Sequence, residues 1–275
     1  MNEAAAELLD VCLGLIDPNA QAITLHAGHN STLALRAATI NGPVIVKLHR
    51  SYDRHHQETN AYRNWTSAVR QQTPRLLAVS DNPLAVVLSV LPGQLLADTL
   101  LSPLMEEDAH RQAGAILRAF HHAAPGSDEP NMTDWLSERA EFWLNQARDL
   151  LPANRRAEIR AHMRALKDLG PLPAVPCHLD YTPRNLLCWT NQLTPTSEVH
   201  ENSSAPNIGV IDFEHARPDL AARDLVRMAT RIWPGRADLE EAFLCGYGSL
   251  EPIDREVIEH CAHLDSLTAT VRRLK

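Results

Sequence analysis

The sequence predicts an α+β fold of two lobes, a small antiparallel sheet with one inserted helix over residues 1–92 and a larger, mainly helical lobe over residues 93–275. Two observations predict it. Five short apolar runs with strand character crowd into the first part, and helical periodicity dominates beyond "LPGQLL" (91–96), which proline and glycine mark as a connector. The chain has 275 residues, of which 44% are apolar, enough for two such lobes.

The first lobe is predicted from its strand and turn signals. After a helix over residues 3–16 come three strands, "AITLHA" (22–27), "TLALRAATI" (32–40) and "PVIVKLHR" (43–50). Asn41-Gly42 between the last two is typical of a hairpin turn. A helix over residues 54–71 follows, with Tyr62, Trp65 and Val69 on one face, and then the strands "RLLAVS" and "LAVVLSV".

The second lobe is predicted to be helical around a short strand pair. Helical patterns cover residues 105–123, 134–150, 153–168, 219–231, 237–246 and 252–273. Strands are expected at 185–189 and 208–212, joined by the polar stretch 190–207, which we interpret as a hairpin loop. "PLPAVP" (171–176) is interpreted as a break between a helix and a loop.

Composition excludes several classes of protein. The net charge of −8 gives no dominant basic face, so nucleic acid is not an expected partner. The N-terminus lacks a basic region and is not a secretory signal, and no apolar run is long enough to span a bilayer, so no membrane partner is expected. The five cysteines form no CxxC pair, which favours reduced thiols in a cytoplasm. We expect a monomer or dimer. The histidines form no zinc motif, and "HCAHL" (260–264) is interpreted as helix surface or core.

A buried charge pair is the first candidate for chemistry. Lys47 is one of only three lysines and lies within the apolar strand run "VIVKL". Burying its ammonium is costly unless an anion meets it. Glu58 shares the inward face of the following helix with Tyr62 and Trp65, so we expect an ion pair between Lys47 and Glu58. The alternative is that Lys47 points outward from an edge strand and Glu58 is solvated.

Two short stretches supply further oxygen-bearing groups. In "CHLDYTPRNLLCW" (177–189), Pro183 argues against a continuous helix, so Asp180 lies in a constrained loop and Asn185 at its exit. In "VIDFEHARPDL", Asp212 ends a buried strand. Asn185 and Asp212 flank neighbouring strands and could share one magnesium ion, which leaves Asp180 to orient an attacking hydroxyl.

The order of these elements resembles the aminoglycoside phosphotransferase and choline kinase branch of the protein-kinase-like superfamily. "CHLDYTPRNLL" is similar to the catalytic loop of that family, "VIDFEHA" to its metal-binding segment, "AGHNSTLAL" (27–35) to its phosphate-covering hairpin and "LSVLPGQLL" to its hinge. The resemblance spans about residues 22 to 230. It implies a bilobal kinase-like fold and transfer of the γ-phosphoryl group of ATP or GTP, with Mg²⁺, to an alcohol.

The resemblance also implies residue roles. Asp180 would be the catalytic base or hydroxyl-orienting residue, and Asn185 and Asp212 the magnesium ligands. Lys47 would contact the α- and β-phosphates, with Glu58 holding it. The small hydroxyls of Ser31 and Thr32 would cover the phosphates, and the backbone of Ser89 and Leu91 would contact adenine. Asp224 is expected to brace the loop without acting in catalysis, and His178 to bond the loop backbone.

The acceptor is predicted to be a small molecule. Glu214 stands where protein kinases have glycine, and no room is left for an activation loop, which argues against a protein kinase. The composition resembles antibiotic-inactivating phosphotransferases, so an aminoglycoside, cyclic-peptide or nucleoside antibiotic is the first expectation, with resistance as the outcome. Acidic helical residues from Glu106 to Glu141 could attract a polycation. Homoserine, choline or fructosamine are the alternative acceptors, and a non-catalytic pseudokinase is the alternative class, whereas the dispersed histidines argue against a metal-dependent hydrolase.

Overall fold

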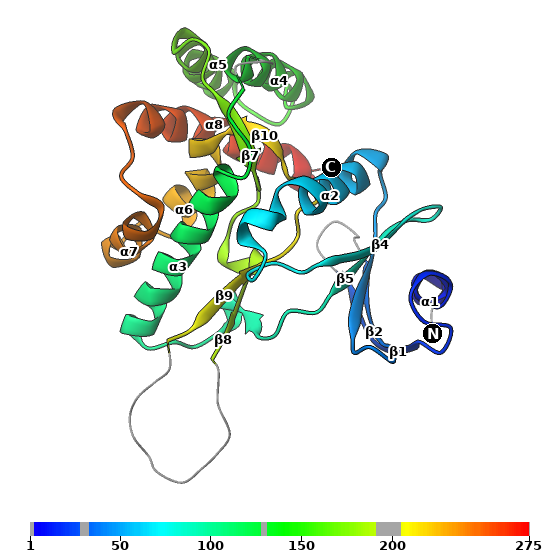
Figure 1. Cartoon of the computed structure of the whole chain (residues 1–275). Helices are drawn as coiled ribbons and strands as arrows, with labels where there is room; N and C mark the ends of the chain where they lie inside the picture. The colour runs from blue at the N-terminus through cyan, green and yellow to red at the C-terminus, as the bar shows by residue number, and fades with distance from the viewer. Residues whose placement is uncertain (1–2, 28–32, 128–130, 191–204, 275) are drawn as a thin grey trace. The chain divides into compact units, whose positions relative to one another are not determined.

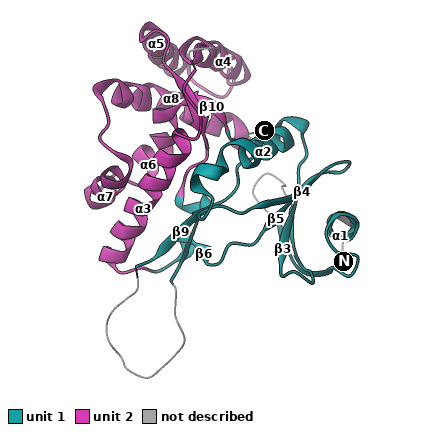
Figure 2. Cartoon of the chain, viewed as in Figure 1, with its two compact units in different colours: residues 1–100, 183–216 teal, residues 101–182, 217–275 magenta. Residues whose placement is uncertain are grey.

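A computed structural model of the chain describes residues 3–27, 33–127, 131–190 and 205–274. The chain divides into two compact units, unit 1 with residues 1–100 and 183–216 and unit 2 with residues 101–182 and 217–275 (Figure 2). The sequence placed the lobe boundary after residue 92 and assigned all later residues to one lobe, whereas residues 183–216 cluster with unit 1. The nucleotide-binding and acceptor-binding roles of the two lobes stay predictions.

Unit 1 contains a five-stranded antiparallel sheet in the order β1-β2-β3-β5-β4 (Figure 1). Its strands are β1 (Gln21–Ala27), β2 (Leu33–Ala38), β3 (Val44–Leu48), β4 (Leu76–Asp81) and β5 (Leu84–Ser89). The predicted hairpin is present, because Thr39 and Gly42 exchange backbone hydrogen bonds. Helix α1 (Glu3–Leu15) packs Leu8 and Cys12 against Leu35 and Val46 of the sheet. The predicted α+β class is confirmed.

Helix α2 (Tyr52–Asn64) follows β3 and ends earlier than the sequence predicted. Ser51 caps it, since its hydroxyl accepts a hydrogen bond from the Arg54 N–H at 3.4 Å. The predicted helix over 54–71 is really α2 followed by the 3-10 helix η2 (Thr66–Val69). Its inward face is as predicted, with Glu58, Tyr62 and Trp65 all buried.

A second sheet in unit 1 joins segments far apart in the sequence. It has the order β6-β8-β9, with β6 (Gln94–Leu95), β8 (Leu186–Trp189) and β9 (Asn207–Val210). β8 follows the 3-10 helix η4 (Pro183–Asn185). This pairing explains why residues 183–216 belong to unit 1. Most of the predicted 190–207 loop, residues 191–204, lies outside the described residues.

Gly93, just before β6, is a position where we predict that an added side chain lowers the stability of the protein. Its φ is +99°, and a Cβ there would lie 2.4 Å from the Cys188 carbonyl oxygen. Gly42 is a matched control, with a φ of +102° and no atom within 4 Å of an added Cβ. Both alanine variants lose about 1 kcal/mol to the left-handed backbone. Gly93→Ala is expected to lose a further 1–3 kcal/mol, roughly, to the clash. Equal denaturant midpoints for the two variants would contradict this.

Unit 2 is mainly helical, and a core that includes Leu136, Ile159, Leu166 and Leu264 lies among several of its helices. The helices are α3 (Pro103–His121), α4 (Met132–Gln146), α5 (Ala153–Asp168), α6 (Val226–Arg231), α7 (Ala237–Tyr247) and α8 (Pro252–Leu274). None of the helices in the described ranges is long and apolar enough to cross a membrane.

Unit 2 also holds a strand pair that the sequence did not predict. β7 (Ala174–Cys177) pairs antiparallel with β10 (Arg217–Leu220). "PLPAVP" is therefore partly a strand and was wrongly interpreted as a break. The predicted helix over 219–231 is wrong at its start, where β10 is followed by the 3-10 helix η5 (Ala221–Leu225) and α6. These strands position the loop that begins at His178.

Candidate active site

Lys47 in β3 lies at the centre of a buried cluster of charges in unit 1. Its side chain is turned inward with the residue 7% exposed, so the outward alternative is wrong. Its Nζ lies 2.8 Å from Glu58 Oε2 and 3.3 Å from Glu214 Oε2, and it also donates to Asp212 Oδ1. Burial lowers the pKa of Lys47, but the three carboxylates outweigh it and hold this pKa above its ordinary value. The lysine is therefore a fixed cation.

Glu58 holds Lys47 from α2, as the sequence predicted. The carboxylate is fully buried, and its Oε2 lies 2.9 Å from His49 Nε2 as well as facing Lys47. Burial raises the pKa of Glu58, but Lys47 and His49 more than compensate, so this pKa lies below its ordinary value. An ionised Glu58 locks the ammonium in one position.

Asn185 and Asp212 are brought together by the pairing of β8 with β9. Leu186 faces Val210 across this pair, and the Ile211 N–H donates to the Asn185 carbonyl at 3.0 Å. The strand ends at Val210, so the prediction that Asp212 ends the strand is wrong by two residues. Asp212 instead adopts a left-handed backbone with a φ of 69°, which turns its side chain toward Lys47.

The donor set at Asn185 and Asp212 fits a magnesium ion. Mg²⁺ prefers carboxylate and amide oxygens, and these side chains come from backbone segments joined by a hydrogen bond. The Asp212 side chain is 34% exposed, so a ligand can reach its carboxylate.

Glu214 is a charged residue of this cluster that sequence reasoning did not assign to it. It is 6% exposed, and its Oε1 accepts a hydrogen bond from Arg54 Nη1 at 2.8 Å. Arg54 also contacts a ring nitrogen of His215 at 2.6 Å. The only sequence signal for Glu214 was its place two residues after Asp212. Arg54 and His49 gave no signal.

Asp180 lies in unit 2, on the loop after β7. The preceding residue, Leu179, has a left-handed φ of 61°, which marks a sharp turn. The Asp180 carboxylate is 28% exposed and forms an ion pair with Arg227, whose Nε lies 3.2 Å from Asp265 Oδ1. The structure therefore gathers Lys47, Glu58, Asn185 and Asp212 within unit 1, and it holds Asp180 within unit 2.

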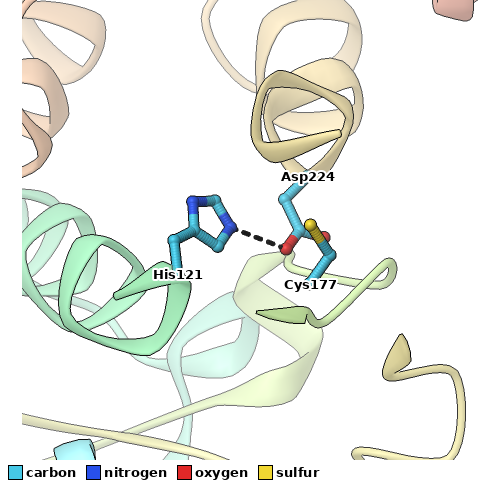
Figure 3. A group of neighbouring side chains, drawn as sticks. All are labelled: His121, Cys177 and Asp224. Carbon is cyan, nitrogen blue, oxygen red and sulfur yellow. Dashed lines mark hydrogen bonds and ion pairs between the residues drawn. The ribbon is translucent and has the colours of Figure 1, made fainter. Parts of the chain in front are cut away.

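Asp224 braces the Asp180 loop, as expected. Its buried carboxylate accepts hydrogen bonds from the N–H of His178 at 2.7 Å and from the N–H of Leu179. His121 of α3 contacts the same carboxylate at 3.1 Å, and Cys177 lies beside it (Figure 3). His178 Nδ1 in turn lies 3.3 Å from the Asp180 N–H, in agreement with a structural role for His178.

Asp224→Asn is expected to destabilise the protein by about 1–3 kcal/mol. The two carboxylate oxygens accept from the buried N–H groups of His178 and Leu179, and in asparagine an N–H₂ group, which cannot accept, would replace one of these oxygens. Asp149→Asn, at an exposed position of unit 2, is the control and should change little. Burial raises the pKa of Asp224, but His121 and the backbone outweigh it, so the folded pKa lies below its ordinary value of 3.8. The carboxylate therefore stabilises the fold above that pH, and its contribution falls as the pH drops through the folded pKa.

That pH dependence gives the measurement. Urea midpoints of wild type and Asp224→Asn should differ most near neutral pH and converge in acid. A difference that stays constant with pH would contradict the assignment.

The remaining predicted site residues concern the nucleotide base and phosphates. The Ser89 N–H donates to the Arg75 carbonyl at 2.9 Å, and the Ser89 hydroxyl accepts from the Arg75 N–H at 2.8 Å. Leu91 follows in the connector, where its side chain packs beside Gly209. Ser31 and Thr32 lie outside the described residues. The adenine and phosphate contacts of all four stay predictions.

Comparisons with known proteins identify the fold. The chain is similar to a choline/ethanolamine kinase family protein from Mesorhizobium loti. The match covers 98% of this chain and 83% of that one, at 21% identity and a TM-score of 0.65. It is similar to macrolide 2'-phosphotransferase from Brachybacterium faecium over 99% of this chain and 93% of that one, at 16% identity and a TM-score of 0.60. The structure of a streptomycin-ATP-APH(2")-IIa ternary complex matches over 99% of this chain and 90% of that one, at 13% identity and a TM-score of 0.61.

Identities this low show a shared fold, and the predicted kinase-like fold is confirmed. None of the curated proteins compared with the chain matches it significantly. The model of the phosphotransferase enzyme family matches residues 22–260. This stretch contains every element on which the resemblance rested, and the chain therefore belongs to the phosphotransferase enzyme family.

Proposed function

We propose that the protein transfers the γ-phosphoryl group of ATP or GTP to a hydroxyl group of a small molecule. The observation that carries this proposal is the buried Lys47, held by Glu58 and facing Asp212. Phosphoryl transfer needs a fixed cation on the phosphates, oxygen ligands for a metal ion and a group that orients the nucleophile. Lys47, the Asn185–Asp212 pair and Asp180 are the residues of this chain that fit these needs.

Lys47 would bind the α- and β-phosphates, and Glu58 would keep its ammonium in place. The backbone of Ser89 and Leu91 would hold the adenine, and Ser31 and Thr32 would cover the phosphates. The similar ternary complex contains ATP, which supports ATP as the donor.

Asn185 and Asp212 would hold the magnesium ion. When bound, this ion neutralises charge on the phosphates during transfer. In the structure Asp212 also pairs with Lys47, so one carboxylate would link the lysine to the metal. This shared carboxylate would keep the phosphate-binding cation and the metal ligand at a fixed separation.

Asp180 would accept the proton of the attacking hydroxyl or orient it. Arg227 contacts the Asp180 carboxylate and is itself held by Asp265. This arrangement would hold the Asp180 carboxylate in one orientation. Arg227 is thus a positioning residue in the proposal.

The acceptor is proposed to be an antibiotic, whose phosphorylation would confer resistance. Similar structures described as macrolide and aminoglycoside phosphotransferases support this class. Acidic residues give it little support, because several already have basic partners in unit 2. The ion pairs are Glu106 with Arg236, Asp108 with Arg111, Asp134 with Lys167 and Glu141 with Arg160.

A primary metabolite such as choline, homoserine or fructosamine is the alternative acceptor. The similar choline/ethanolamine kinase family protein supports it. A non-catalytic pseudokinase is a weaker alternative, because Lys47, Glu58 and Asp212 keep the contacts that a catalytic site needs.

The test is phosphate transfer by the purified protein with Mg²⁺ and ATP or GTP in parallel. Acceptors are aminoglycosides, a macrolide, cyclic-peptide and nucleoside antibiotics, choline, homoserine and a fructosamine, with products identified by mass. A gain of one phosphoryl group on an antibiotic supports the first proposal. A gain on a metabolite alone supports the second. Binding of Mg-nucleotide without transfer to any acceptor would contradict both and favour the pseudokinase.

A further inference from the structure

A cluster of histidines lies between helices α5 and α8 of unit 2, which pack side by side (Figure 1). His162 projects from α5, and His260 and His263 project from successive turns of α8. The three rings are partly buried. Nothing in the proposed phosphotransferase function uses them.

The two nearest imidazoles are spaced like ligands of one metal ion. The Nδ1 atoms of His162 and His260 lie 3.1 Å apart. In a tetrahedral zinc site with Zn–N distances of about 2.0–2.1 Å, two nitrogen ligands are about 3.3 Å apart. A Glu259 carboxylate oxygen completes a group of three ligand atoms that all lie within 4.8 Å of one another. Two imidazoles and a carboxylate are a ligand set that zinc accepts.

His263 supports this arrangement without being a ligand in it. Its ring stacks on that of His162, with centroids 3.6 Å apart and an angle of 14° between the planes. Stacking restricts the His162 ring and so fixes the direction in which its Nδ1 atom points.

A second possible group, Glu158 with His162 and His263, fits less well. Glu158 Oε2 is already held by Arg155 Nη1 at 2.7 Å, and its Oε1 lies 3.9 Å from His263 Nδ1. The positive charge of Arg155 also opposes a cation there. The geometry therefore favours the His260 side of the cluster.

We propose that His162, His260 and Glu259 bind one divalent transition-metal ion of the zinc class, which links α5 to α8. Water would occupy the remaining position. The site would stabilise the packing of these two helices and is independent of phosphoryl transfer. Sequence reasoning interpreted "HCAHL" as helix surface or core because the histidines form no zinc motif. His162, the third imidazole, lies 98 residues from His260.

The test is metal binding by the full chain after removal of metals with a chelator. Zn²⁺ is titrated calorimetrically in excess Mg²⁺, which occupies sites made of oxygen ligands, and Co²⁺ absorption reports tetrahedral coordination. We expect one equivalent to bind and to raise the unfolding temperature. His162→Gln and His260→Gln should each weaken this binding by about tenfold or more. His122→Gln, at the exposed residue that follows α3, is the control and should bind like wild type.

Three results would overturn the proposal. One is the absence of a saturable equivalent, which would mean that His162 and His260 only share a proton. Another is binding that persists unchanged in both ligand variants while circular dichroism shows that they are folded. The third is loss of binding in His263→Gln but not in His260→Gln, which would place the ion on the Glu158 side.

Discussion

Asp180→Ala is expected to lower turnover by about 10²–10⁴-fold, because a positioned base contributes roughly this much to proton transfer. Nucleotide affinity should change little, since Asp180 is proposed to act on the acceptor and not on the phosphates. Turnover is measured with the acceptor identified in the panel, and nucleotide affinity by calorimetry. Two separate readouts are needed because a damaged fold would lower both.

The contacts of Asp180 indicate that Asp180→Ala will keep its fold, so that a loss of turnover reports on catalysis. Its partner Arg227 keeps a second carboxylate, Asp265, at 3.2 Å, so removal of Asp180 does not leave Arg227 unpaired. The carboxylate is also partly exposed, and alanine there creates no buried cavity. Asp149→Asn serves again as the exposed control. Turnover at the wild-type rate in Asp180→Ala would remove it from the catalytic machinery.

Local patterns predicted most of the fold. The run "VIVKL" predicted β3, and Asn41-Gly42 predicted the turn before it. The helical spacing of Glu58, Tyr62 and Trp65 placed Glu58 inward, and the structure shows its contact with Lys47 at 2.8 Å. In each case the decisive residues are close in sequence, so periodicity and turn chemistry are sufficient.

The strand pair β7–β10 shows what local patterns miss. Each strand has four residues, and Pro176 faces Pro218 across the pair. Proline has no N–H for a ladder and normally indicates a break. It is tolerated here because a two-stranded sheet has only edge strands. Neither strand has a signal until its partner about forty residues away is known.

The candidate site shows the same limit. Lys47, Asn185 and Asp212 were found because their motifs stand in a recognisable order. Glu214 and Arg54 pair across 160 residues, and no local pattern relates them. For Glu214, the only sequence signal was its place two residues after Asp212, where protein kinases have glycine. Its burial beside Lys47 follows from the sharp turn at Asp212, which periodicity does not predict.

Asp212→Ala is expected to weaken binding of Mg-nucleotide by about tenfold or more, a loss of about 1.4 kcal/mol or more of binding free energy. It removes a proposed magnesium ligand and the hydrogen-bond acceptor of Lys47. The variant has a second effect, because Asp212 has a φ of 69°. Alanine tolerates this backbone less well than aspartate, so the free protein should also lose about 1 kcal/mol of stability.

Asp212→Asn separates the two effects. Asparagine tolerates the left-handed backbone and keeps the size of the side chain, but it lacks the negative charge. We expect it to lose Mg-nucleotide affinity like Asp212→Ala while its unfolding midpoint stays closer to that of wild type. Asp81→Asn, an 86% exposed carboxylate in the same unit, is the control. If Asp212→Asn bound Mg-nucleotide like wild type, the carboxylate would serve only to hold Lys47, and the metal would need another ligand. If binding fell in step with stability across both variants, the turn itself, and not the charge, would be what Asp212 supplies.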